Sequence, residues 1–157
     1  MTRSLPALAL LALTACGSAI QPLPGTYTIR TAEAGTDTCD LAEEVDLVGE
    51  SFSLTVNDDQ IEAAIGDDRS VTFDCLMDGD EMLCDPFTQV QDVGGDESDA
   101  VVTIAWDLGG TFADESTVEA GELGLDYSCA GADCAAFGDD AGISLPCQTV
   151  FAITASL

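Results

Sequence analysis

Cysteine thiols and acidic side chains are the groups in this 157-residue chain that could do chemistry, since it has seven Cys, 30 Asp and Glu, three Arg, no Lys and no His. The absence of His rules out Ser–His and Cys–His nucleophile pairs and imidazole metal sites. The absence of Lys rules out a Schiff-base residue and the lysine of a phosphate-binding P-loop. The formal net charge of −27 repels a polyphosphate backbone, so we expect no binding to nucleic acid.

An even set of six cysteines lies beyond Cys16, and in an exported chain such a set is typical of three disulfide bonds. Its members are Cys39, Cys75, Cys84, Cys129, Cys134 and Cys147. Cys75 and Cys84 lie in a predicted hairpin whose register sets them opposite each other, although a shift of one residue would separate them. Cys129 and Cys134 flank a short loop, and Cys39 and Cys147 are then left to pair. A Cys-rich metal site is the alternative, but the spacing lacks two CxxC motifs.

The N-terminal residues have the pattern of an export signal. Arg3 is the only charged residue before Arg30, and it precedes an apolar run from Leu5 to Leu13. A basic start, a short apolar run and small residues at its end are typical of a secretory signal. The run is too short to cross a bilayer as a helix, which takes about 20 residues.

The end of the apolar run, Leu13-Thr14-Ala15-Cys16, resembles the lipobox of bacterial lipoproteins, in which a large aliphatic residue and two small residues precede a Cys. The resemblance implies cleavage before Cys16 and acylation of its thiol and of the new amino terminus. Several acyl chains on one residue anchor a protein stably, because each buried CH₂ contributes about 0.8 kcal/mol. Gly17 in place of Asp implies the outer membrane. The alternatives are an ordinary signal peptide with an incidental Cys, or a buried apolar N-terminal helix.

This pattern divides the chain into three parts: a signal peptide (residues 1–15), a lipidated N-terminus and tether (16–24), and a single β domain (25–157). Residues 17–24 carry no charge and no periodicity, which favours a tether. In the domain, Asp40 could begin a short helix with Leu41, Val45 and Val48 on one side.

Alternation of apolar and polar residues dominates from Phe52 onward and indicates consecutive antiparallel strands. The first hairpin after residue 51 is expected to pair Val56 with Ile61, Leu54 with Ala63 and Phe52 with Ile65. The next two hairpins are expected to pair Ile65 with Val71 and Met77 with Met82. The strand that holds Trp106 in phase with the core is expected to end at Gly109-Gly110, and a bulge is expected near Gly121 and Gly124. Residues 91–99 and 130–146 are expected to be loops.

About eight short strands with regular turns and almost no helix predict an all-β domain: an antiparallel meander that forms a small, disulfide-linked β-sandwich or an up-and-down barrel. The opening Gly25-Thr26-Tyr27 strand followed by consecutive hairpins is similar to the lipocalin-like barrel pattern, although lipocalins carry Gly-x-Trp there.

The acidic residues gather in turns, and they have two interpretations. The first is a solvated, self-repelling surface, which would suit a high-salt habitat. The second is weak Ca²⁺ binding by the loop from Asp92 to Asp99, which offers the oxygen ligands that Ca²⁺ prefers but lacks the EF-hand spacing.

The sequence also favours some function classes over others. We expect no enzymatic activity, because Gly-x-Ser-x-Gly, HExxH and Gly-rich phosphate loops are absent. The expected function is that of an envelope lipoprotein with a structural or interaction role, with the membrane and an envelope protein as partners and no cofactor. The alternative is a small-ligand binder that uses a barrel interior, which needs a cavity of at least about 300 Å³.

Overall fold

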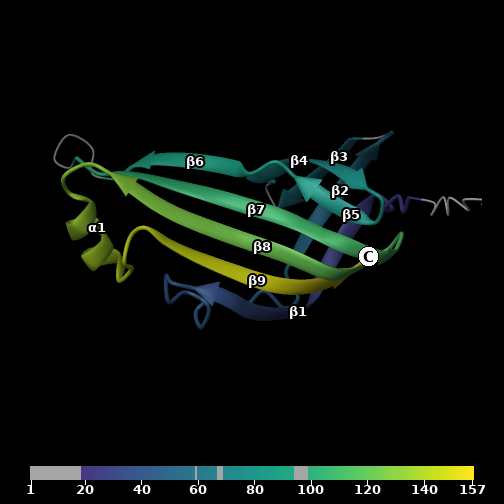
Figure 1. The fold of residues 1–157 in the computed structure, drawn as a ribbon, viewed down its shortest axis with the longest axis horizontal. Coiled ribbons are helices and arrows are strands. Elements are labelled where there is room, and N and C mark those ends of the chain that lie inside the picture. The colour runs from purple at the N-terminus through teal and green to yellow at the C-terminus, as the bar shows by residue number, and fades with distance from the viewer. Residues whose placement is uncertain (1–18, 59, 67–68, 94–98) are drawn as a thin grey trace, which may run out of the picture.

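The computed structural model describes residues 19–58, 60–66, 69–93 and 99–157, which form the antiparallel β domain drawn in Figure 1. Its elements are β1 (Gly25–Asp37), β2 (Ser51–Asn57), β3 (Gln60–Ile65), β4 (Val71–Asp78), β5 (Glu81–Cys84), β6 (Phe87–Asp92), β7 (Val101–Asp114), β8 (Thr117–Ala130), α1 (Cys134–Ala141) and β9 (Cys147–Ser156). The predicted all-β class and the meander are confirmed.

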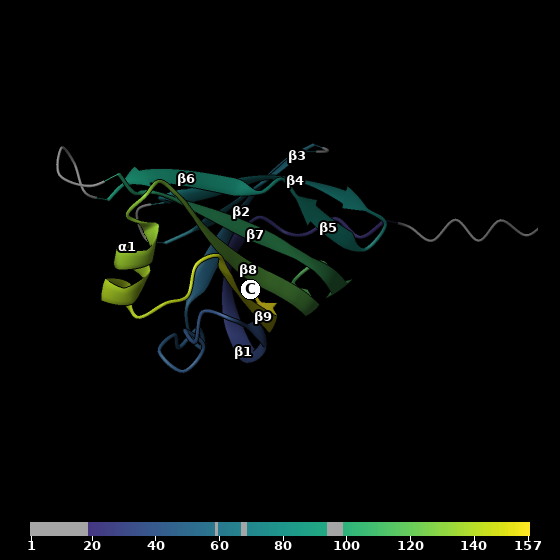
Figure 2. The same cartoon turned by 60° about the vertical axis from the view of Figure 1, so that its left-hand side comes forward.

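The strands form one sheet in the order β5-β4-β3-β2-β1-β9-β8-β7-β6, and an additional pairing of β5 with β7 closes eight of them into a ring. β5 and β6 follow each other along the same edge of β7, with Asp85 and Pro86 between them. Together they take the place of one strand, so the closed ring is an up-and-down barrel. The outer halves of β7 and β8 continue beyond it with β6 and carry α1 at their far end (Figures 1 and 2).

The predicted hairpin registers are confirmed residue by residue. Phe52 lies opposite Ile65, Leu54 opposite Ala63 and Val56 opposite Ile61, and the next two hairpins pair as expected. These pairs line one face of the sheet because side chains alternate along a strand. That face forms the core, whose large buried members include Tyr27, Phe52, Phe73, Met82, Phe112, Leu123 and Phe151.

The meander gives the barrel two different ends. The turns after β2, β4 and β7 lie at one end, which we call the docked end because residues 19–24 pack there. The loop after β1 (residues 38–50) and the described residues Gly66, Arg69 and Ser70 after β3 lie at the opposite end, which we call the open end. Residues 19–24 and α1 lie at opposite ends of the domain (Figures 1 and 2).

Residues 19–24, which we call the docked segment, are held against the barrel. The backbone N–H of Ile20 donates to Gly79 O at 3.0 Å and that of Leu23 to Glu115 O at 2.7 Å. The Gln21 side chain donates to Asp58 O at 2.8 Å, and Pro22 is fully buried. The predicted tether is therefore part of the domain over these residues. Residues 1–18, including the signal peptide and Cys16, lie outside the described residues.

β7 does not end at its two glycines, and this corrects the sequence-based prediction. The strand runs through Gly109 and Gly110 to Asp114, and Gly110 lies opposite Gly121 of β8. A Cβ atom on Gly110 would lie 2.9 Å from the Cα of Gly121, so the two strands approach more closely here than larger residues would allow. The predicted irregularity in β8 is present: its pairing with β9 shifts register between Val118 and Gly121.

The helix prediction was wrong in its position. Residues 41–49 contain turns and no helix, and α1 forms instead at residues 134–141, inside the stretch predicted as a loop. Asp37 rather than Asp40 holds this loop, since its carboxylate accepts the N–H groups of Leu41 and Ala42 at 3.2 and 2.8 Å. The Ala42 N–H above all keeps the pKa of this carboxyl below its ordinary value. Residues 38–50 are thereby fixed to the end of β1.

Candidate functional site

All six cysteines of the β domain are joined in disulfides, in the pairing that the sequence favours. Cys39 pairs with Cys147, Cys75 with Cys84, and Cys129 with Cys134. The first bond joins the end of β1 to the start of β9, the second joins β4 to β5, and the third joins β8 to α1. These sulfurs serve the fold, so no thiol of these six is free for catalysis or for a metal.

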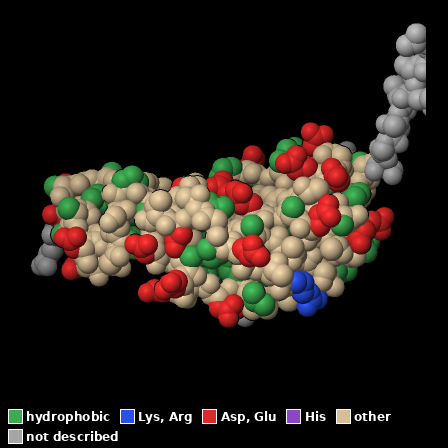
Figure 3. All heavy atoms as spheres, turned by 60° about the horizontal axis from the view of Figure 1, so that its bottom comes forward, with side chains coloured by type: hydrophobic (Ala, Val, Ile, Leu, Met, Phe, Trp, Pro, Cys, Tyr) green, Lys and Arg blue, Asp and Glu red, His purple; other side chains and the backbone are tan. Residues whose placement is uncertain are grey.

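Acidic side chains are scattered in separate patches over the face drawn in Figure 3. No group of three Asp, Glu, Cys or His side chains in the described residues is arranged to hold a metal ion. Asp99, at one end of the proposed Ca²⁺ loop, accepts the Ala132 N–H at 3.4 Å, and its own N–H donates to Asp133 at 2.7 Å. Residues 94–98 of that loop lie outside the described residues, so Ca²⁺ binding there stays a prediction.

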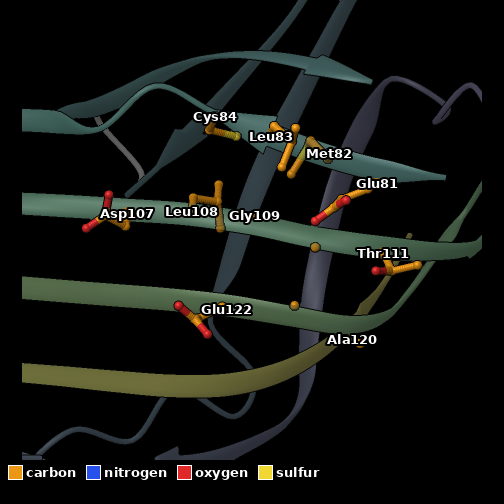
Figure 4. Close-up of a pocket in the computed structure, with 12 residues that line it drawn as sticks. Glu81, Met82, Leu83, Cys84, Asp107, Leu108, Gly109, Thr111, Ala120 and Glu122 are labelled. Atoms are coloured by element: carbon orange, nitrogen blue, oxygen red, sulfur yellow. The ribbon is translucent and has the colours of Figure 1, made fainter. Parts of the chain in front are cut away.

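An open groove of about 440 Å³ crosses the outside of β5, β7 and β8. Its floor is low because Gly109 and Gly110 carry no side chains. Figure 4 shows the carboxyl groups of Glu81, Asp107 and Glu122 spread around it rather than directed to one point. This groove therefore offers neither a metal cage nor an apolar surface that would hold a ligand.

The charged form of the Asp107 carboxyl, on the edge of this groove, is destabilised by its surroundings. Burial raises the pKa of its carboxyl, and the nearby charge of Asp126 raises it further. A carboxyl whose pKa is higher in the folded state lowers stability at pH values above that pKa, and the cost vanishes once the group is protonated in both states.

We therefore expect Asp107→Asn to raise the free energy of unfolding at pH 7 by up to about 1 kcal/mol, the scale of a like-charge cross-strand pair. The gain should shrink steadily as the pH is lowered toward about 3, as measured by urea unfolding. Glu119→Gln, an exposed change on the same sheet, is the control and should stay within about 0.5 kcal/mol at both pH values. A loss of stability at pH 7 would contradict this account of Asp107.

An apolar cavity lies at the open end of the barrel and has a volume of about 440 Å³. Its floor is made of core side chains from β1, β2, β7, β8 and β9: Ile29, Phe52, Leu108, Leu123 and Ile153. Its mouth is made by Val45, Asp46, Leu47 and Glu50 of the loop after β1, and by Ile65 and Gly66. The mouths of β-barrels are common positions for small-molecule sites, which are concave and mostly apolar.

Trp106, Leu125 and Tyr127 form the wall of this cavity on β7 and β8. Trp106 was expected in the core, but it is only partly buried and packs against the core cluster. Its indole N–H is shielded from solvent and has no hydrogen-bond partner in the described part of the chain. Burial raises the pKa of the Tyr127 hydroxyl. The wall is thus aromatic and apolar with two polar groups, a composition suited to holding a flat or linear apolar molecule.

The open end exists because β1 leaves β2. β1 pairs with β2 only from Gly25 to Thr28. From Thr28 to Asp37 it pairs with β9, with a register shift between Ile29 and Thr31. Residues 38–50 occupy the resulting gap and put Val45 and Leu47 over the cavity. Sequence reasoning placed Val45 on the apolar side of a predicted helix and missed Leu47, and it assigned neither residue to a cavity.

Comparisons of the chain with protein-family models, with curated proteins and with solved structures found no match. Within the described residues, no helix is long and apolar enough to span a membrane.

Proposed function

We propose that this chain is a lipid-anchored envelope protein whose β domain binds a small apolar molecule in the open-end cavity. The observation that supports binding is the cavity itself, which at about 440 Å³ exceeds the roughly 300 Å³ that a small-molecule site needs. A barrel with a purely structural role would gain stability by filling that space with side chains. The cavity therefore favours the ligand-binding hypothesis over the structural one.

Ligand binding can be tested with 1-decanol, because Trp106 is the only Trp in the chain and lines the cavity. We expect a saturable change in tryptophan fluorescence as decanol fills the cavity. Leu125→Glu would put a carboxylate on the cavity wall and should weaken decanol binding at least about tenfold, because burying an unpaired charge is costly. Leu83→Glu is the matched control, since Leu83 is 50% exposed on the outer face. Absence of saturable binding, or equal loss in both variants, would refute the proposal.

The anchor rests on the lipobox-like residues 13–16, and the docked segment adds indirect support. That segment leads from the N-terminal region to the end of the barrel opposite the cavity, so an acyl anchor at Cys16 would leave the cavity unobstructed.

Lipidation can be tested by expressing the full chain in a Gram-negative host with labelled palmitate. We expect label on the wild-type protein, an amino terminus at Cys16 and recovery in the membrane fraction. Cys16→Ser should lose the label and become soluble, because a single change removes the only thiol that the lipobox presents. An unlabelled wild-type protein cleaved at another residue would show an ordinary signal peptide and end the anchoring proposal.

A further inference from the structure

The mouth of the cavity is negatively charged. Asp46 and Glu50 both line it and both are exposed to solvent. The Val48 N–H donates to one carboxylate oxygen of Asp46 at 3.1 Å, which fixes that side chain beside the opening. Glu43 and Glu44 lie on the same loop. A ligand whose apolar body fills the cavity would leave its polar head among these carboxylates.

Within the described residues, both arginine side chains have partners other than the mouth carboxylates. Of the chain's three basic residues, Arg30 and Arg69 lie in the described part. Arg69, on the loop after β3, forms a salt bridge with Glu62. Arg30 donates to Ser156 Oγ at 2.8 Å, near the docked end. The net charge of −27 adds a long-range field of the same sign as the mouth.

The geometry points to a cationic amphiphile as the ligand: an apolar chain or ring system that fills the cavity, with an ammonium-type head at the mouth beside Asp46 and Glu50. This inference rests on the proposed ligand-binding function and adds the charge of the head group. The carboxylates act across water, so each has a modest effect that depends on salt. The same argument disfavours fatty-acid anions, although their chains would fit the apolar floor equally well.

Three probes with the same ten-carbon chain separate the preference for a cationic head from apolar binding itself: decylammonium, decanol and decanoate. Each is titrated at pH 7 and low salt, and binding is followed by the fluorescence of Trp106. We expect decylammonium to bind about tenfold tighter than decanol, and decanoate at least about tenfold weaker than decanol. In about 1 M salt the Debye length falls to about 3 Å, so the three affinities should converge.

A matched pair of variants tests whether the mouth carboxylates are responsible. Asp46→Asn combined with Glu50→Gln should reduce the preference for decylammonium over decanol to about threefold or less. Glu119→Gln combined with Glu122→Gln removes the same charge from β8, away from the mouth, and should leave the preference near tenfold. Equal affinities for decanol and decylammonium, tighter decanoate binding, or equal loss in both variants would overturn the inference. Failure of all three probes to bind would instead refute the proposed function.

Discussion

Replacing both Cys39 and Cys147 with alanine is expected to lower the free energy of unfolding by about 5 kcal/mol. This disulfide spans a sequence separation of 108 residues, so it restricts the unfolded chain more than a short loop would. Both cysteines are also buried in the folded domain, so alanine would leave small voids as well. The measurement is urea unfolding of the purified domain, followed by circular dichroism.

The other two disulfides serve as controls because their loops are short. Cys75 and Cys84 are separated by nine residues and Cys129 and Cys134 by five, for which chain entropy predicts losses of about 3 and about 2 kcal/mol. Equal losses in all three double variants would show that native-state packing, and not loop length, determines the contribution of each bond.

Tyr27→Ala is expected to cost about 3–5 kcal/mol, the range for removing a large buried aromatic side chain. Tyr27 has no solvent exposure. Its ring stacks on Phe52 with centroids 5.5 Å apart and meets the edge of Phe112 at 6.0 Å. Its hydroxyl hydrogen is shared between the carbonyl oxygens of Leu23 and Glu115, at O···O distances of 2.9 and 3.0 Å. The residue therefore joins the core to the docked segment.

Tyr27→Phe separates these two roles. It keeps the ring and removes the hydroxyl, so we expect a loss of about 1–2 kcal/mol from the hydrogen bonds. The amide hydrogens of Ile20 and Leu23 should then exchange faster with solvent, because the docked segment loses its link to Tyr27. Tyr127→Phe is the control, since the only other Tyr lies in the cavity wall; its effect on stability should stay within about 0.5 kcal/mol. Unchanged exchange in Tyr27→Phe would contradict the role given to the hydroxyl.

Local pattern was enough to predict the hairpins. Where apolar residues alternate on both sides of a short turn, as Leu54 and Ala63 do, one register places apolar side chains opposite each other and the shifted register does not. The same register set Cys75 opposite Cys84. Closure of the ring could not be predicted in this way, because it depends on the pairing of β5 with β7. No short turn joins these two strands, and six other strands lie between them in the order of the sheet.

The cavity and the docked segment were beyond local pattern for a related reason. Trp106 is in phase with Ile104 and Leu108, so alternation alone assigns it to the core. It borders a cavity because β1 separates from β2 on the far side of the barrel, which alternation cannot predict. β6 is largely exposed and carries little apolar alternation, so its pairing with β7 was also missed. Residues 19–24 lack any periodic signal. Their position is set by backbone hydrogen bonds to two turns and by a side-chain hydrogen bond from Gln21 to a third.

The attachment of the docked segment determines how the domain would stand on a bilayer. Only Gly17 and Ser18 separate Cys16 from Ala19, and three peptide units reach at most about 11 Å. An acylated Cys16 would hold the barrel upright, with Asp58, Gly79 and Glu115 toward the phospholipid headgroups and its long axis pointing outward. A ligand would then enter the cavity from the aqueous side and not from the membrane leaflet.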